Sequence, residues 1–171
     1  MKRTISLLLA ICAIIGVFAI PASAASNWSS EMSTEFKPVS AYYAGVYPKY
    51  VWAIQRFFFA FSGTQSEMAG STHDGAWGSK TRAALGKYQR NYMGETPDYI
   101  AGSRTWTSIA GTLKSTPGRL EEMDCHRLVL KESGSPVFMA TYGSNPTFFY
   151  FYGTGTNAQV SERYNFHPFN G

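Results

Sequence analysis

The chain of 171 residues contains two cysteines, and Cys125, which lies outside the apolar N-terminal segment, has the strongest capacity for covalent chemistry. A thiol becomes a nucleophile when a neighbouring base takes its proton, so His126 and the distant His167 are candidate partners. Adjacent side chains on a strand point to opposite faces, which argues against contact between Cys125 and His126. Because no orienting group or oxyanion turn is recognisable, we interpret Cys125 as a buried thiol. Intermolecular pairing and a nucleophilic role are the alternatives.

The other residue types that support catalysis form no recognisable site. No zinc site is expected, because the histidines are isolated and no His-x-x-x-His pair exists; they are His73, His126 and His167. The carboxylates between residues 121 and 124 form a local acidic cluster, which is typical of solvated surface rather than of a glycosidase. The GSKT motif at residues 78–81 lacks the upstream glycine spacing of a phosphate-binding loop. The sequence therefore predicts no catalytic residue, no metal ligand and no cofactor.

One pattern occurs twice in the middle of the chain. DGAWGSKT at residues 74–81 returns as DYIAGSRT at residues 98–105, displaced by 24 positions. In each copy an Asp can hydrogen-bond the following turn, a Gly tolerates a left-handed or crowded backbone, and a Ser is a predicted N-cap. Each copy therefore predicts the start of a helix, with Gly78 and Gly102 expected where a side chain would strain the backbone. The predicted turn residues are Asp74, Gly75, Gly78, Asp98 and Gly102.

Three segments around these turns have apolar residues at helical spacing, and each is predicted to be an amphipathic helix. The segments are 50–61, 81–92 and 105–113. The apolar stripes are Val51, Ile54, Phe58 and Phe61 in the first, Thr81, Ala84, Leu85, Tyr88 and Tyr92 in the second, and Trp106, Ile109 and Leu113 in the third.

The three predicted helices and two Asp turns resemble the type-1 peptidoglycan-binding domain, a small three-helix module of bacterial cell-wall proteins. The resemblance covers roughly residues 47–113 and rests on Ile54-Gln55, on DGAWGSKTRAALGKYQ and on GSRTW. Two departures are a longer loop at residues 62–73 and Tyr99 in place of the usual glycine of the second turn. The resemblance implies peptidoglycan as the ligand, bound near the helix entrances. The ligand-binding candidates are Trp77, Arg82, Gln89 and Tyr99; for Trp77, a place in the core is the favoured interpretation and ligand binding is the alternative.

The N-terminus has the organisation of a signal peptide. Lys2 and Arg3 precede an apolar stretch at residues 5–20, and small residues follow up to Ala24. Cleavage there predicts a secreted protein, periplasmic or extracellular and associated with the cell wall, with no stable membrane insertion. The remaining chain has 13 basic and 11 acidic residues, and these are scattered, so nucleic acid is not an expected partner.

The predicted class is α+β, a helical module followed by a short antiparallel β-meander. The predicted divisions are a signal peptide at residues 1–24, an arm or linker at 25–46, the helical module at 47–116 and an aromatic-rich β tail at 117–171. Within the tail, strands are expected at residues 126–132, 137–142, 147–152 and, as a fourth, 158–164. The aromatic run at 148–152 is expected to pack on the helical module; a sugar-stacking platform or a protein-partner surface is the alternative.

Together these features predict a non-catalytic envelope protein that binds peptidoglycan. The residues after the helical module resemble no catalytic domain that would supply wall chemistry. Two alternatives remain open. One is a small cell-wall-modifying enzyme that uses Cys125 and a histidine, and the other is a structural protein-interaction module without wall affinity.

Overall fold

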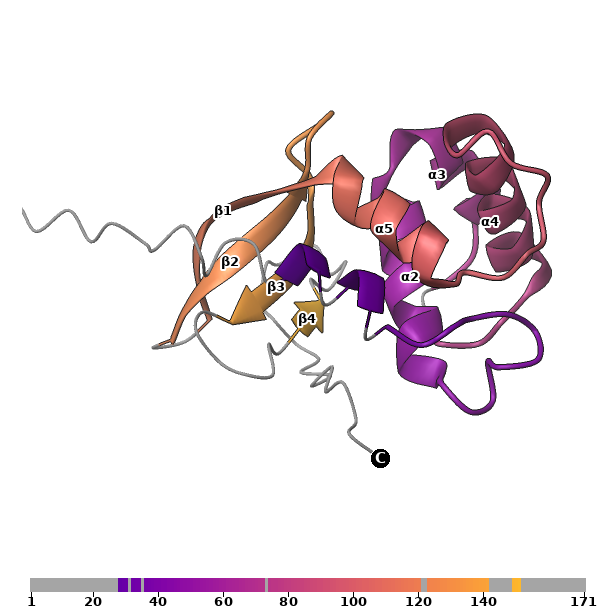
Figure 1. Ribbon diagram of the computed structural model, residues 1–171, viewed down its shortest axis with the longest axis horizontal. Coiled ribbons are helices and arrows are strands. Elements are labelled where there is room, and N and C mark those ends of the chain that lie inside the picture. Colours follow the sequence, from indigo (N-terminus) through magenta and orange to yellow (C-terminus); the bar gives the residue numbers. More distant parts are fainter. Residues whose placement is uncertain are drawn as a thin grey trace, which may run out of the picture.

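The computed structural model describes residues 28–30, 32–34, 36–72, 74–120, 123–141 and 149–151. Helices gather at one end of the molecule and an antiparallel sheet at the other (Figure 1). The helices are α2 (Pro48–Ala60), α3 (Ser62–Met68), α4 (Ser79–Tyr92) and α5 (Ser103–Thr112). The strands are β1 (Leu113–Leu120), β2 (Met123–Leu130), β3 (Pro136–Thr141) and β4 (Phe149–Phe151). The predicted α+β class is confirmed.

The helices α2, α4 and α5 lie at the three segments predicted from periodicity, but the predicted three-helix count is not confirmed. The additional helix α3 occupies part of the segment 62–73 that was expected to be a loop. It follows α2 after a single residue, and the Thr64 hydroxyl donates a hydrogen bond to the Phe58 carbonyl oxygen at 3.1 Å. Met68, at the end of α3, is fully buried and anchors the helix to the core. The short polar sequence of α3 has too few apolar residues for its helical period to be visible.

The helical core is built around α2, which begins with Pro48 in its first turn, a position that suits proline because no helical N–H is needed there. The predicted stripe of α2 is buried as expected, from Val51 to Phe61. On α4, Tyr88 is fully buried and packs edge-on against Phe57 with ring centroids 5.3 Å apart. Burial raises the pKa of the Tyr88 phenol to about 12, although its hydrogen bond to Ser108 opposes the shift.

The described residues before α2 contribute side chains to the core. The buried apolar side chains among them are Trp28, Met32, Phe36 and Val39. Phe36 packs edge-on against Trp106, with ring centroids 5.0 Å apart, and the Trp106 indole N–H donates to the Lys37 carbonyl oxygen at 3.2 Å. Val39 also forms an antiparallel bridge with Ala101, just before α5. These contacts hold this segment against α5.

The sheet is a meander in which the strands follow one another in the order β1-β2-β3-β4, each antiparallel to the next. Three of the predicted strands correspond to β2, β3 and β4, whereas the predicted strand at 158–164 lies outside the described residues. The first strand, β1, was missed because Pro117 and Gly118 interrupt it. Proline is tolerated there because, among the described strands, β1 lies at the edge of the sheet and pairs with β2 alone. The β region begins at Leu113, within the segment predicted to be the helical module.

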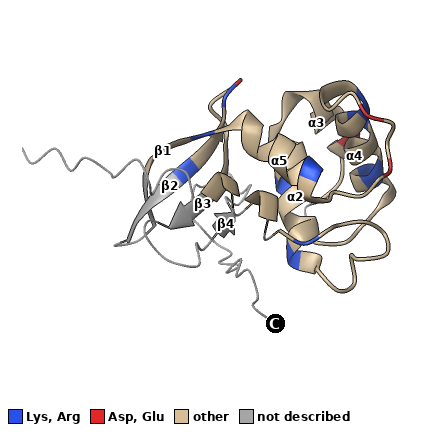
Figure 2. Ribbon diagram, in the orientation of Figure 1, with Lys and Arg blue, Asp and Glu red and all other residues tan. Residues whose placement is uncertain are grey.

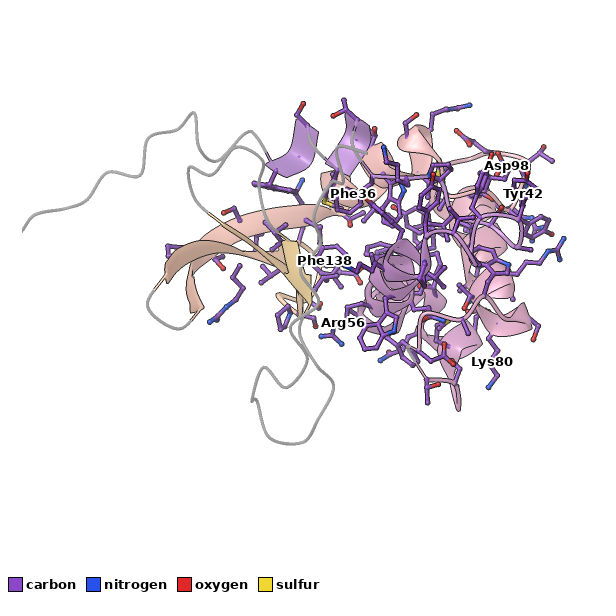
Figure 3. The ribbon with its side chains drawn as sticks, turned by 90° about the horizontal axis from the view of Figure 1, so that it is seen from below. Phe36, Tyr42, Arg56, Lys80, Asp98 and Phe138 are labelled. Carbon is purple, nitrogen blue, oxygen red and sulfur yellow. The ribbon has the colours of Figure 1, made fainter. Side chains whose placement is uncertain are left out.

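Side chains of the sheet complete the same core as the helices. Phe138 of β3 lies between the sheet and α2 (Figure 3), and it is 1% exposed. Next to it, the Arg56 guanidinium donates a hydrogen bond to the Pro136 carbonyl oxygen at 2.9 Å, and its burial lowers the pKa of the group. The backbone N–H of Ser62 donates to the Glu132 carboxylate at 3.0 Å. Apolar packing and these two hydrogen bonds join the helices to the sheet.

Candidate functional site

The first Asp turn is held by a buried glutamine from α2. Gln55 is 2% exposed, and its side-chain amide donates to the Ala76 carbonyl oxygen at 2.8 Å and lies 3.2 Å from the Thr81 hydroxyl. Its Oε1 accepts the backbone N–H of Gly75 at 3.0 Å. Asp74 closes the turn by accepting the Ala76 N–H at 2.9 Å. The turn therefore satisfies its backbone groups with two side chains, one from α2 and one of its own.

The second Asp turn repeats this arrangement with a glutamine from α4. Gln89 is also 2% exposed; its amide donates to Asp98 at 2.6 Å and to the Ile100 carbonyl oxygen at 3.1 Å. Its Oε1 accepts the backbone N–H of Tyr99 at 3.0 Å, and Asp98 accepts the Ile100 N–H at 2.8 Å. Gln89 was a ligand-binding candidate, but the structure places it beneath the turn, where it positions Tyr99.

Two glycines of the repeats, Gly78 and Gly102, have other roles than predicted, whereas Gly75 lies in the first turn. Gly78 and Gly102 are the N-caps of α4 and α5 and have extended backbone with negative φ, and an added Cβ would meet nothing within 4 Å at either position. The expectation of backbone strain at both residues is therefore wrong. The predicted N-cap serines, Ser79 and Ser103, are instead the first helical residues. The left-handed position of the first turn is Gly75, with φ of 74°.

Tyr99 takes the position in the second turn that Gly75 takes in the first. Its φ of 60° makes it the one non-glycine residue with positive φ in the part of the chain that the structure describes. Such a conformation costs an L-residue about 1–2 kcal/mol, and strain of this kind is frequent at functional sites. The Tyr99 ring lies against α4 at Gly86, where an added Cβ would stand 2.5 Å from Cε1 of the ring. The absence of a side chain at residue 86 thus makes room for Tyr99.

The guanidinium of Arg82 stacks on the Tyr99 ring, with its central carbon 3.6 Å from the ring centroid. A cation over an aromatic face is attracted by the negative face of the ring. Arg82 is itself exposed. Among the residues that the structure describes, its guanidinium has no hydrogen-bonded or ion-paired partner, so its N–H groups remain available to a ligand.

A groove with a volume of about 510 Å³ runs along this face of α4. It is lined by residues of α4 between Ser79 and Asn91 together with Glu67 and Tyr99, and we call it the α4 groove. Its lining includes three basic residues and one carboxylate: Arg82, Lys87, Arg90 and Glu67. The basic positions of α4 lie at the end of the molecule opposite the sheet (Figure 2). The α4 groove is therefore suited to an anionic ligand.

One basic residue of the groove is already neutralised. Lys87 forms an ion pair with Glu67 at 2.9 Å. Hydrogen bonds from the Ser66 hydroxyl and from Lys87 hold the pKa of the Glu67 carboxyl below its ordinary value. Arg90 is exposed and, within the described part of the chain, has no side-chain partner. Among the described residues, the unpaired charges of the groove are thus the two arginines, Arg82 and Arg90.

The other predicted site residues are distributed differently. Trp77 is half-buried, packs against the core and does not line the α4 groove. Trp106, for which no ligand role was predicted, is fully buried in the core. Gly86, Lys87 and Arg90 were not identified from the sequence. The spacing of Arg82, Gly86 and Arg90, four residues apart on α4, was the signal that could have found them.

A second hollow, with a volume of about 470 Å³, lies between the end of α4 and α5. Its lining includes Tyr92, Glu95 and Arg104. Here the basic residue is paired, because Arg104 forms an ion pair with Glu95. This hollow offers no unpaired charge comparable to Arg82, so we regard the α4 groove as the candidate site.

The candidate catalytic groups are not assembled in the described residues. Cys125 and His126 lie in β2, opposite Gly118 and Pro117 of β1, so the predicted strand is confirmed at the level of the backbone. Their side chains, His73 and His167 lie outside the described residues. In the portion of the chain that is described, no group of three potential metal ligands occurs, and no helix has the length and apolar character needed to cross a bilayer.

The carboxyl of Asp74 predicts a contribution of the first turn to acid stability. Hydrogen bonds from the Ala76 N–H first, and then from Gln55 and Thr72, favour the charged form and lower its pKa below 3.8. The folded state therefore binds this proton less well than the unfolded state, and stability is lost as pH falls from about 3.8 through the folded value. We expect Asp74→Asn to flatten this part of the pH dependence in urea unfolding measured between pH 7 and pH 2. Equal slopes for both proteins would contradict it.

No protein-family model, curated protein or solved structure matched the chain.

Proposed function

We propose that the protein is a non-catalytic, secreted protein of the bacterial envelope that binds cell-wall peptidoglycan through the α4 groove. The observation that carries the proposal is the exposed Arg82 guanidinium, which lies on the Tyr99 ring in a groove with more basic than acidic residues. Peptidoglycan carries peptide carboxylates, and an arginine fork binds a carboxylate through two parallel hydrogen bonds. The groove also lies on the segment that resembles the type-1 peptidoglycan-binding domain.

The test is a pull-down of the protein with purified insoluble sacculi, combined with an assay for soluble fragments released from them. We expect binding without release. Arg82→Ala is expected to lower the affinity about tenfold, because hydrogen bonds to charged groups contribute about 1.5–3 kcal/mol. The combined variant Arg82→Ala and Tyr99→Ala is expected to lose most of the binding.

A matched control is Arg104→Ala, which removes the same charge from an exposed helical position at the second hollow. Its sacculus binding should equal that of the unmodified protein. Release of soluble fragments would favour the wall-modifying enzyme. A folded protein that binds no sacculi would favour the interaction module, and binding that survives the combined variant would place the ligand elsewhere on the molecule.

A further inference from the structure

The α4 groove has, on one helical face, two guanidiniums that are unpaired among the described residues, and between them lies a position without a side chain. Arg82, Gly86 and Arg90 are four residues apart, so they share one face of α4. Eight residues of helix rise about 12 Å along the axis, so the α-carbons of the two arginines are separated by about that distance along α4. The Tyr99 ring packs at Gly86, between them.

Tyr99 orients Arg82 instead of serving as an open stacking platform. The guanidinium covers one face of the ring at 3.6 Å, and the ring edge at Cε1 lies against Gly86. Stacking leaves the edge of the guanidinium, where its N–H donors lie, free for a planar acceptor. The backbone of Tyr99 is fixed in turn by Gln89, which is buried beneath it. The side chain that binds the ligand is therefore preorganised by contacts that involve no ligand.

The charges favour a ligand with two separate anionic groups. Because Lys87 is neutralised by Glu67, the described residues leave two uncompensated positive charges in the groove, one at each arginine. A single phosphate would be served by several donors that converge on one point, whereas these two arginines lie two helical turns apart. An extended peptide rises about 3.3 Å per residue, so carboxylates four residues apart span about 13 Å. That span is close to the axial separation of the two arginine α-carbons, about 12 Å.

We infer that the α4 groove binds an extended peptide with two carboxylates about four residues apart, one at Arg82 and one at Arg90. This inference rests on the proposed function in one respect: that function makes the peptides of peptidoglycan the natural source of the two carboxylates. The recognition itself is a property of the groove and can be tested with a soluble peptide.

The experiment is a titration of the protein with acetyl-Glu-Ala-Ala-Ala-Glu-amide at constant ionic strength, followed through the Nε–H resonances of its arginines by NMR. We expect the resonances of Arg82 and Arg90 to shift. The matched peptide in which both Glu residues are Gln should bind at least about tenfold more weakly, because it removes two charge-assisted hydrogen-bonding groups. Inorganic phosphate should bind more weakly than the dicarboxylate peptide.

Four variants separate the roles of the residues. Arg82→Gln and Arg90→Gln should each weaken peptide binding about tenfold, and Arg104→Gln should leave it unchanged. Tyr99→Asn keeps a residue type that tolerates positive φ but removes the ring, so binding should fall about fivefold through the loss of orientation. All four positions are at least partly exposed, and equal far-UV circular dichroism would verify that each variant is folded.

Equal binding of the Glu and Gln peptides, no binding of either, or tighter binding of phosphate would overturn the inference. Those results leave the proposed function intact if sacculi are still bound through Arg82. Conversely, peptide binding by a protein that does not bind sacculi would support the inference and contradict the proposed function.

Discussion

Replacing Gln55 with alanine is expected to lower the free energy of unfolding by about 2–4 kcal/mol, because it leaves a buried N–H and a partly buried carbonyl oxygen of the first turn without this partner. The Gly75 N–H and the Ala76 carbonyl oxygen both depend on this side chain, at 3.0 and 2.8 Å. An unsatisfied buried donor or acceptor costs about 1–3 kcal/mol, and the loss of packing adds to it. Urea unfolding at pH 7 measures the change.

The matched control for this substitution is Gln65→Ala on α3, where the side chain is exposed. It should change the free energy of unfolding by less than about 0.5 kcal/mol. Gln55→Glu supplies a second, sharper comparison because it keeps the shape and the acceptor for Gly75. The new carboxylate would face Asp74 and the Ala76 carbonyl oxygen, so we expect destabilisation at pH 7 that diminishes below about pH 4, where carboxylates become protonated. A stable Gln55→Ala protein would show that the turn does not depend on the glutamine.

The positions of α2, α4 and α5 could be predicted because side chains that are buried at helical spacing leave a periodic pattern of apolar residues in the sequence. The stripe of Val51, Ile54, Phe58 and Phe61, along α2 and its C-cap, is an instance, since each of these residues is buried in the core. The strand β1 could not be predicted, because it contains Pro117, and a proline inside a strand is tolerated when that strand lies at the edge of a sheet, as β1 does beside β2. Edge position is a property of the assembled sheet and is not visible in the segment itself.

The candidate site could likewise be predicted only in part. Asp74 and Asp98 could be assigned to turns because their side chains bond to residues two positions further on. The glutamines that hold these turns are 19 and 9 residues from the respective Asp, so they do not share the 24-residue displacement of the repeat. Gln89 was consequently assigned to the ligand. Arg82 and Tyr99 were identified separately, but only the folded turn brings the guanidinium onto the ring.

The glycines illustrate why residue type alone did not show which position of the first turn has positive φ. All of Gly75, Gly78 and Gly102 are compatible with a strained backbone, and the sequence contains no measure of φ. The structure assigns positive φ to Gly75 and extended backbone to the other two. A capping glycine in extended conformation tolerates a side chain, and serine is among the most favourable residues at that position.

Gly75→Ala is therefore expected to destabilise the protein by about 2–4 kcal/mol, for two reasons that can be separated. The alanine would have to adopt φ near 74°, and its Cβ would collide with the Trp52 ring and stand 3.2 Å from the Pro48 carbonyl oxygen. Gly94→Ala isolates the first reason, because Gly94 has φ of 68° and open space around it, so its cost should be about 1–2 kcal/mol. Gly78→Ser, at an N-cap with ordinary φ, should be neutral or stabilise by a few tenths of a kcal/mol. If Gly75→Ala costs no more than Gly94→Ala in urea unfolding, then the contact between the first turn and α2 at Trp52 does not restrict residue 75, and only the backbone conformation selects glycine there.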